Sequence, residues 1–351
     1  MAWFSPVWQI IGAIIHAMAS ITVQAHVPET GPIRPLSILR DLPQVADLIE
    51  LCFALTIDDE GQSYLQQMRR ASHNSDFLHW AEKVADSTSL PLSGFVWEEN
   101  GKIVGNASLV YQSYKGRKIA MIANVATHPD YRRRGIGRAV TEQAMTYARQ
   151  KGAQELWLQV RDDNPTAIKI YNDLGFVERA RRTTYHIKTV APLPLTFQLA
   201  RNDTSTKIIT LQPNSHDWPL QHEWLLQAHP EELRWYAHWD WDVLAPGIWR
   251  WLYRAFIEYE IRQWAVVENG ALVATVSWVP TARASNILWV AARSDVDATG
   301  LGSALQMARR DLIRYHGLTI EHPAGEMVKA FEIAGFEPFR TLIWMRAAAT
   351  P

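Results

Sequence analysis

Apolar and polar positions recur with two different periods along this chain, and the changes of period predict its elements. The spacing is helical in LPQVADLIELCFAL, whereas IVGNASLV alternates as a strand does and follows an Asn-Gly turn. The predicted elements of the first half are a helix at 42–55, strands at 94–98, 103–112 and 118–127, a helix at 135–150, a strand at 155–160, a short helix from Asn164-Pro165 and a strand at 183–190. This order predicts an α/β fold in which helices flank a mixed sheet.

Three segments of the first half recur in the second half in the same order. The pairs are ENGKIVGNAS (99–108) with ENGALVATVS (268–277), GIGRAV (135–140) with GLGSAL (300–305), and IYNDLGF (170–176) with AFEIAGF (330–336). One match would carry little weight, but three in order indicate that a single α/β unit is duplicated. We therefore expect two tandem domains, each with a mixed, mostly antiparallel sheet flanked by helices.

The expected organisation has four parts. They are an N-terminal apolar extension (1–33), a first domain (34–190), a Pro-bearing linker (191–206) and a second domain (207–351). Within the extension, PVWQIIGAIIHAMASITV (6–23) is apolar, but it lacks a basic flank and is interrupted by Gln9 and His16. We expect an extra packed helix or a weakly ordered leader here rather than a membrane anchor, and a true start at Met18 is an alternative.

Composition and charge narrow the function classes. The formal net charge is -1, so no nucleic-acid or membrane-surface partner is expected, and any anion site must be local. Cys52 is the single cysteine, which excludes an intrachain disulfide and fits a cytoplasmic location. No grouping of His, Cys, Asp and Glu has metal-ligand spacing, so no metal is expected.

The stretch HPDYRRRGIGRAV (128–140) combines arginines with glycines ahead of a predicted helix. Glycine lets the backbone approach a ligand closely, and the free N–H groups of a helix N-terminus attract an anion. The pattern therefore predicts a phosphate or pyrophosphate site, with a glycine turn among solvated arginines as the alternative. A P-loop is absent, and Val140 stands where a dinucleotide fingerprint needs a small residue.

This stretch resembles motif A of the GNAT family of N-acetyltransferases, Arg/Gln-x-x-Gly-x-Gly/Ala, in its residues Arg132 to Gly137. Further along, NPTAIKIYNDLGF (164–176) resembles motif B of the same family. The resemblance implies an enzyme that transfers an acetyl group from the co-substrate acetyl-CoA to a primary amine. The acceptor stays open between a small-molecule amine and a peptide N-terminus, since acceptor loops vary within one fold.

The resemblance also implies a set of site residues. Main-chain groups of Val125, Ala126 and Thr127 would bind the pantetheine arm. The pyrophosphate would be bound by Arg132, Arg133, Arg134, Gly135, Ile136, Gly137 and Arg138. Asn164 would bind pantetheine or a phosphate, or only cap its helix. Tyr171 would be the general acid that protonates the CoA thiolate, with a packing tyrosine as the alternative.

The general base is not assigned by the sequence. Alanine N-acetyltransferases of the family carry a Glu on the strand that ends L-x-V-R, and this chain has Gln159 there. Asp162 and Asp163 are near in sequence, but they can equally cap the next helix. Deprotonation of the amine through water, or by a residue of the second copy, therefore stays open.

The second copy has lost the residues that carry the chemistry. Arg132 aligns with Asp297, Tyr171 with Phe331 and Asn164 with Ala324, whereas the glycines of motif A persist. We therefore expect one catalytic site, in the first copy. A regulator that binds acyl-CoA without turnover is the alternative function, and an enzyme tethered to a membrane by residues 6–23 is a weaker one.

Overall fold

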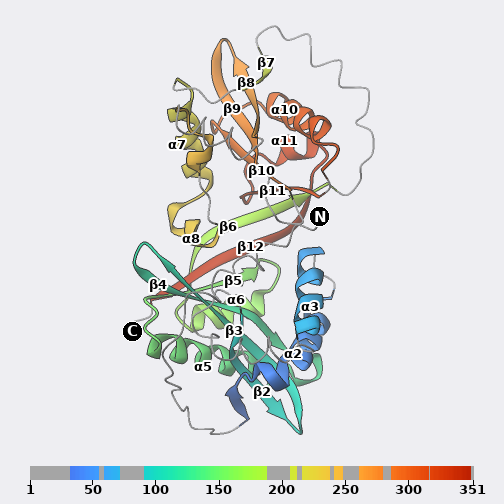
Figure 1. Ribbon diagram of the computed structural model, residues 1–351, viewed down its shortest axis with the longest axis vertical. Coiled ribbons are helices and arrows are strands. Elements are labelled where there is room, and N and C mark those ends of the chain that lie inside the picture. Colours follow the sequence, from blue (N-terminus) through green and yellow to red (C-terminus); the bar gives the residue numbers. More distant parts are fainter. Residues whose placement is uncertain are drawn as a thin grey trace. The chain divides into compact units, whose positions relative to one another are not determined.

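The computed structural model describes residues 32–54, 59–71, 91–187, 206–211, 216–237, 241–247, 261–279, 286–315 and 317–348. The chain divides into two compact units (Figure 1). The described residues up to Ala180 form the N-terminal unit together with the segment from Ile343, and those from Arg181 to Leu342 form the C-terminal unit. The predicted extension lies outside the described residues except for 32–33, and the predicted linker except for Thr206.

No helix among the described residues is both long enough and apolar enough to span a bilayer. The apolar segment 6–23, on which the membrane alternative rests, lies outside these residues.

The N-terminal unit is a sheet with helices on both faces. Its elements are β1 (Ile33–Pro35), α2 (Ile38–Phe53), α3 (Asp59–Ala71), β2 (Ser93–Glu99), β3 (Lys102–Tyr114), β4 (Arg117–Thr127), η1 (Pro129–Tyr131), α5 (Ile136–Gln150), β5 (Glu155–Arg161), α6 (Pro165–Asp173), the start of β6 (Val177–His186) and the end of β12 (Glu337–Ala348). The strand order is β1-β2-β3-β4-β5-β12. Strands β1 to β4 pair antiparallel, and β4 pairs with β5 in parallel.

Two separate apolar cores show which helices cover which face of this sheet. Phe95 packs with residues of α5, whereas its neighbour Val96 packs with residues of α2 and α3. Because consecutive strand residues point to opposite faces, α2 and α3 cover one face of the sheet and α5 covers the other (Figure 1).

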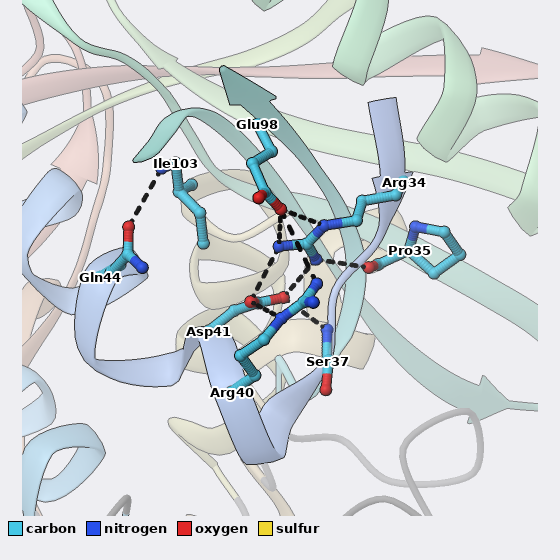
Figure 2. A network of polar contacts seen from close by, with 8 residues as sticks. All are labelled: Arg34, Pro35, Ser37, Arg40, Asp41, Gln44, Glu98 and Ile103. Atoms are coloured by element: carbon cyan, nitrogen blue, oxygen red, sulfur yellow. Dashed lines mark hydrogen bonds and ion pairs between the residues drawn. The ribbon is translucent and has the colours of Figure 1, made fainter. Parts of the chain in front are cut away.

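A buried ion-pair network joins the start of α2 to the sheet (Figure 2). The Asp41 carboxylate accepts hydrogen bonds from the Arg34 guanidinium at 2.5 and 2.9 Å and from the Ser37 backbone N–H at 2.8 Å. Burial alone would raise the pKa of Asp41, but these bonds outweigh burial and hold the pKa below its ordinary value. Arg34 also donates to Glu98 on β2 at 2.6 Å. The network therefore fixes the position of α2, the helix next to the candidate site.

The N-terminal unit takes its last strand from the far end of the sequence. Ile343, Met345 and Ala347 of β12 alternate into the core that also contains residues of α5 and α6. On the opposite face of β12, Trp344 contacts the fully buried Trp157 edge to face. The apolar run of β12 is visible in the sequence, but its partner strand is not.

The C-terminal unit repeats the plan of the first. Its elements are the end of β6, β7 (Thr206–Thr210), α7 (Trp218–Ala228), η3 (Glu231–Leu233), α8 (Arg234–Ala237), η4 (Trp241–Leu244), β8 (Arg262–Glu268), β9 (Ala271–Trp278), β10 (Asn286–Ala292), α10 (Ala298–Asp311), β11 (Leu318–Pro323), α11 (Val328–Ile333) and the start of β12. The strand order is β6-β11-β10-β9-β8-β7, antiparallel except for the parallel pair β10–β11. The predicted fold class, two α/β units with mostly antiparallel mixed sheets, is confirmed.

The observed elements differ from the predicted ones in three places. Helix α2 begins at Ile38 rather than at 42, because tertiary bonds to Asp41 stabilise a first turn that precedes Pro43. Strand β6 begins at Val177, six residues before the predicted start at 183. Helix α3 was not predicted, since its sequence DEGQSYLQQMRRA is mostly polar.

Candidate active site

Strands β4 and β5 pair over only part of their length. Their parallel ladder runs from Ile119 opposite Glu155 to Ile122 opposite Leu158. Strand β4 continues to Thr127 and β5 to Arg161 without further register partners between them. The predicted pantetheine residues 125–127 lie on this unpaired part of β4. Backbone N–H and C=O groups at such an edge can hydrogen-bond an extended ligand.

A β-bulge changes the direction of β4 just beyond the last residue that pairs with β5. Asn106 pairs with Ala126 and Ser108 with Ala123, so β4 has one residue more than β3 between these pairs. Asn124, in the bulge, has φ +52°, a left-handed conformation that Asn tolerates better than most residues. The buried Asn106 side chain donates to the Asn124 carbonyl at 2.8 Å and to the Ser108 hydroxyl at 3.2 Å. The bulge is therefore bonded from both the main chain and a side chain of β3.

The glycines of motif A open the N-terminus of α5 beside the end of β4. Gly135 precedes the helix with φ +76°, and no side chain caps the N-terminal N–H groups of α5. A Cβ on Gly137 would lie 3.2 Å from the Thr127 hydroxyl oxygen, so the first helical turn and the end of β4 are in close contact. The side chain of Ile136 is buried, which leaves its backbone for a ligand. The structure thus brings together the residues predicted to bind pantetheine and pyrophosphate.

The four arginines of the motif differ in their partners. Arg134 forms an ion pair with Glu99 at 2.8 Å, and Arg138 forms one with Glu142 at 2.9 Å. Arg132 lies beside the Cys52 thiol, and Arg133 is exposed and makes no ion pair with any residue that the structure describes. Exposed ion pairs are weak, so Arg134 and Arg138 can exchange a carboxylate for a phosphate at small cost.

Tyr171 and Asn164 lie on α6. The Asn164 side chain accepts a hydrogen bond from the Ala167 N–H at 3.1 Å, so Asn164 caps the helix, and a ligand contact remains a prediction. Tyr171 is buried, contacts Phe176 edge to face, and belongs to the core of the N-terminal unit. Burial raises the pKa of Tyr171 to about 12, which keeps its hydroxyl protonated at neutral pH.

Two acidic residues follow Gln159 at the end of β5: Asp163 is paired with Arg161, whereas Asp162 is exposed and makes no hydrogen bond or ion pair with a residue that the structure describes. Asp163 accepts two hydrogen bonds from the Arg161 guanidinium, at 2.9 and 2.6 Å. The hydrogen bond from Arg161 lowers the pKa of Asp163, which makes this carboxylate a poorer proton acceptor. The base stays unassigned among the described residues.

The helix N-terminus that no side chain caps in the N-terminal unit is capped in the C-terminal unit. The Asp297 carboxylate caps α10 by accepting from the Gly300 N–H at 2.9 Å, so a side chain already occupies this helix N-terminus. A Cβ on Gly302 would lie 2.8 Å from the Ile333 Cβ, which shows that this glycine serves the packing of α10 on α11. The residue that aligns with Arg132 is therefore not only of opposite charge but also occupies the N-terminus of its helix.

The C-terminal unit also lacks the bulge. Thr275, Val276 and Ser277 pair one to one with Ala291, Val290 and Trp289, with no extra residue in β10. Phe331, which aligns with Tyr171, is fully buried and has no proton to give. The two units share a fold, and among the described residues only the first combines a bulged strand end with a helix N-terminus that no side chain caps.

Two buried histidines of the C-terminal unit predict sensitivity to acid. Burial and the charge of Arg182, which bonds His229 at 2.7 Å, lower the pKa of His229 well below its ordinary value and that of His322 to about 3. The unfolded chain therefore binds protons below pH 6.5 that the folded chain rejects, and the free energy of unfolding falls from there towards pH 3. We expect a loss of about 1.4 kcal/mol per pH unit for each histidine.

Urea unfolding followed by tryptophan fluorescence between pH 7 and pH 4.5 tests this expectation, because most tryptophans lie in the second half of the sequence. The variant His322→Leu removes one of the two protons and should flatten the profile relative to the native chain. Equal slopes for the two proteins would show that His322 does not titrate on unfolding.

The comparisons with known proteins agree with this geometry. A model of the acetyltransferase (GNAT) family matches residues 49–176. Over 111 residues the chain is 35% identical to the ribosomal protein bS18-alanine N-acetyltransferase of Escherichia coli K12. The aligned segment covers 31% of this chain and 72% of the relative. The chain is 29% identical over 113 residues to the L-amino acid N-acyltransferase of the same strain, spanning 32% of this chain and 66% of that one.

Among solved structures, a GCN5-related N-acetyltransferase from Sphaerobacter thermophilus covers 92% of this chain and 98% of its own, with a TM-score of 0.53 and 15% identity. At that identity the likeness shows the fold. The fold and the site define an acyltransferase of the N-acetyltransferase type. The chain belongs to the GNAT family.

The sequence did not reveal Tyr64, Asn106 or Asn124 as parts of this site. Tyr64 lies on the unpredicted helix α3, and its hydroxyl accepts a hydrogen bond from the Asn124 side chain at 3.1 Å. An Asn within an otherwise apolar strand was the one available signal for the bulge.

Proposed function

We propose that this protein transfers the acetyl group of acetyl-CoA to a primary amine, in the N-terminal unit. One observation supports this most strongly: the uncapped N-terminus of α5 lies against the unpaired, bulged end of β4. The corresponding helix N-terminus of the C-terminal unit is occupied by Asp297. We therefore place the single active site in the domain predicted at 34–190, completed by the end of β12.

The residues of this site have complementary tasks in binding acetyl-CoA. The N–H groups of residues 133–138 face the pyrophosphate, and the dipole of α5 favours its negative charge. Arg132 and Arg133 add positive charge beside it. Residues 125–127 extend along the pantetheine arm and hydrogen-bond its amides as a neighbouring strand would. This arrangement would bring the thioester to the bulge at Asn124.

The chemistry is direct attack of the amine nitrogen on the thioester carbonyl carbon. The carbonyl electron pair moves to oxygen, and a backbone N–H near residues 126–127 stabilises the oxyanion. When the C–S bond breaks, the CoA sulfur takes a proton from Tyr171, whose raised pKa keeps that proton available. The amine loses its own proton to water, since Gln159 cannot accept one, Asp163 is bonded to Arg161 and Asp162 is exposed to solvent. Water then returns a proton to Tyr171.

The acceptor we propose is the primary amine of a small molecule or a peptide. Two relatives are named for acceptors of this kind, an alanine of a ribosomal protein and L-amino acids. The near-zero net charge supports neither a nucleic-acid nor a membrane-surface partner. The single cysteine supports action in the cytoplasm.

A regulator that binds acyl-CoA without turnover is the second candidate. The observation that favours it is that Gln159 cannot act as a base and that Arg161 engages the carboxylate of Asp163. Such a protein would bind acetyl-CoA yet release no thiol with any amine.

The substitution Tyr171→Phe tests the transfer mechanism. We expect the turnover number to fall about 100-fold, the size typical of a lost general acid, with little change in acetyl-CoA affinity. Release of CoA thiol is measured with a panel of L-amino acids and peptides. The control is Tyr185→Phe, a buried tyrosine of the C-terminal unit whose pKa is also raised by burial. Equal rates for both variants would remove Tyr171 from the mechanism, and no turnover by the native chain would favour the regulator.

A further inference from the structure

Helix α3 places a second tyrosine hydroxyl at the bulge of β4. The Asn124 side-chain amide donates to the Tyr64 hydroxyl oxygen at 3.1 Å. Asn124 lies beyond the last rung of the β4–β5 ladder, where the thioester is proposed to bind. Tyr64 packs against the core between the sheet and α2, which also contains Ala126, one of the predicted pantetheine residues. The tyrosine thus lies on the α2 face of the sheet, opposite to α5.

The hydrogen-bond roles at Tyr64 leave one donor unused. A phenol oxygen can accept hydrogen bonds and also donate its own proton. Tyr64 accepts from Asn124, and no residue that the structure describes accepts its O–H proton. Burial raises the pKa of Tyr64 to about 12, so the hydroxyl remains a donor and cannot serve as the missing base.

A second polar atom at the bulge also has no partner. The Oδ1 atom of Asn106 is buried and receives no hydrogen bond from the described residues, although its Nδ2 atom donates to Asn124 and Ser108. Turning the amide over would place Oδ1 against the Asn124 carbonyl oxygen, so the observed orientation is the favourable one. An unpaired donor and an unpaired buried acceptor, both on residues bonded to Asn124, indicate a site built to contact a polar ligand.

The C-terminal unit shows that these groups are not required by the fold. In the alignment of the two repeats, Thr275 occupies the position of Asn106, and β10 has no extra residue to match Asn124. Ser277 aligns with Ser108, and its hydroxyl accepts hydrogen bonds from the side chains of Gln221 and Gln263 instead. The fold therefore forms without a bulge in the C-terminal unit. The bulge is present in the N-terminal unit, where no side chain caps the N-terminus of α5.

We propose that Tyr64 is a further catalytic residue, whose hydroxyl donates a hydrogen bond to the acyl carbonyl oxygen of the bound thioester, and that Asn124 and Asn106 position it. This inference rests on the proposed function. As the amine nitrogen bonds to the carbonyl carbon, the carbonyl electron pair moves to oxygen and Tyr64 stabilises the negative charge without giving up its proton. The oxygen then re-forms the double bond, the C–S pair leaves with sulfur, and sulfur takes its proton from Tyr171. The attacking nitrogen releases a proton to water, and water returns a proton to Tyr171.

The test compares Tyr64→Phe with the native full-length chain in two measurements. Turnover should fall 10- to 100-fold while the KM for acetyl-CoA changes less than twofold, because the oxyanion bond is strongest in the transition state. Binding is compared between acetyl-CoA and S-ethyl-CoA, which lacks the carbonyl oxygen. The native chain should prefer acetyl-CoA about three- to tenfold, and Tyr64→Phe should abolish that preference.

Two further variants separate this role from packing. Met68→Leu changes a buried residue of the same helix and should leave both measurements near native values. Asn124→Gly keeps the positive φ but removes the amide, and should lower turnover in the same direction as Tyr64→Phe. A Tyr64→Phe protein with native turnover and a native preference for acetyl-CoA would overturn the inference. Absence of acetyl-CoA binding by the native chain would instead overturn the proposed function.

Discussion

Replacing Ala347 with Asp should unfold or severely destabilise the N-terminal unit, although Ala347 lies 167 residues beyond Ala180 in the sequence. Ala347 is buried in the core that also contains Val140, Ala144 and Leu158. A carboxylate there would be dehydrated without a partner, and we expect a loss of about 4 kcal/mol in the free energy of unfolding.

The neighbouring alanine supplies a matched control. Ala348 ends the same strand and is exposed, so Ala348→Asp adds the same charge one residue further on without burying it. We expect this variant to stay within about 0.5 kcal/mol of the native protein. Urea denaturation and acetyl-CoA affinity are measured for both variants. Similar stability and affinity in the two proteins would show that β12 does not complete the N-terminal core.

The same strand explains why the unit should not tolerate truncation. Strand β5 lies between β4 and β12, so loss of β12 would expose the backbone of β5 as an edge. It would also uncover Trp157, which contacts Trp344, and the core face that Ile343 and Met345 cover. The active unit therefore depends on residues that its sequence motifs do not include.

Local patterns predicted most of what lies between Ser93 and Asp173. Alternation marked β2, β3 and β4, and the Asn164-Pro165 pair marked the start of α6. These signals succeed because a half-buried strand or a capped helix imposes its own period on the sequence.

What the sequence hid are features set by distant partners. Tyr64 lies on a mostly polar helix, and its importance comes from Asn124, which is 60 residues away. The bulge changes β4 in the sequence only by one Asn among apolar residues, and the pairing with β3 is what locates it. Asp297 shows the reverse case: the alignment marked a loss of positive charge, and the structure adds that the carboxylate caps its own helix.

Replacing Gly137 with Asp should abolish acetyl-CoA binding while leaving the fold intact. Gly137 is in the first turn of α5, where a carboxylate stabilises the helix but repels a bound pyrophosphate. One added charge about 4 Å from a phosphate costs about 4 kcal/mol near a protein surface, roughly a 1,000-fold loss of affinity. The native C-terminal unit already has a carboxylate at its own helix N-terminus, on the N-cap residue Asp297 of α10.

Titration calorimetry of acetyl-CoA into the full-length chain measures both stoichiometry and affinity. We expect one site in the native chain and no measurable binding in Gly137→Asp. Gly137→Asn adds a side chain of the same size without the charge, so it measures only the effect of crowding. Its Cβ would lie 3.2 Å from the Thr127 hydroxyl oxygen. We expect it to weaken binding far less than Gly137→Asp does. Two sites in the native chain would mean that the carboxylate of Asp297 does not exclude the ligand. Native affinity in Gly137→Asp would mean that the pyrophosphate does not bind at the N-terminus of α5.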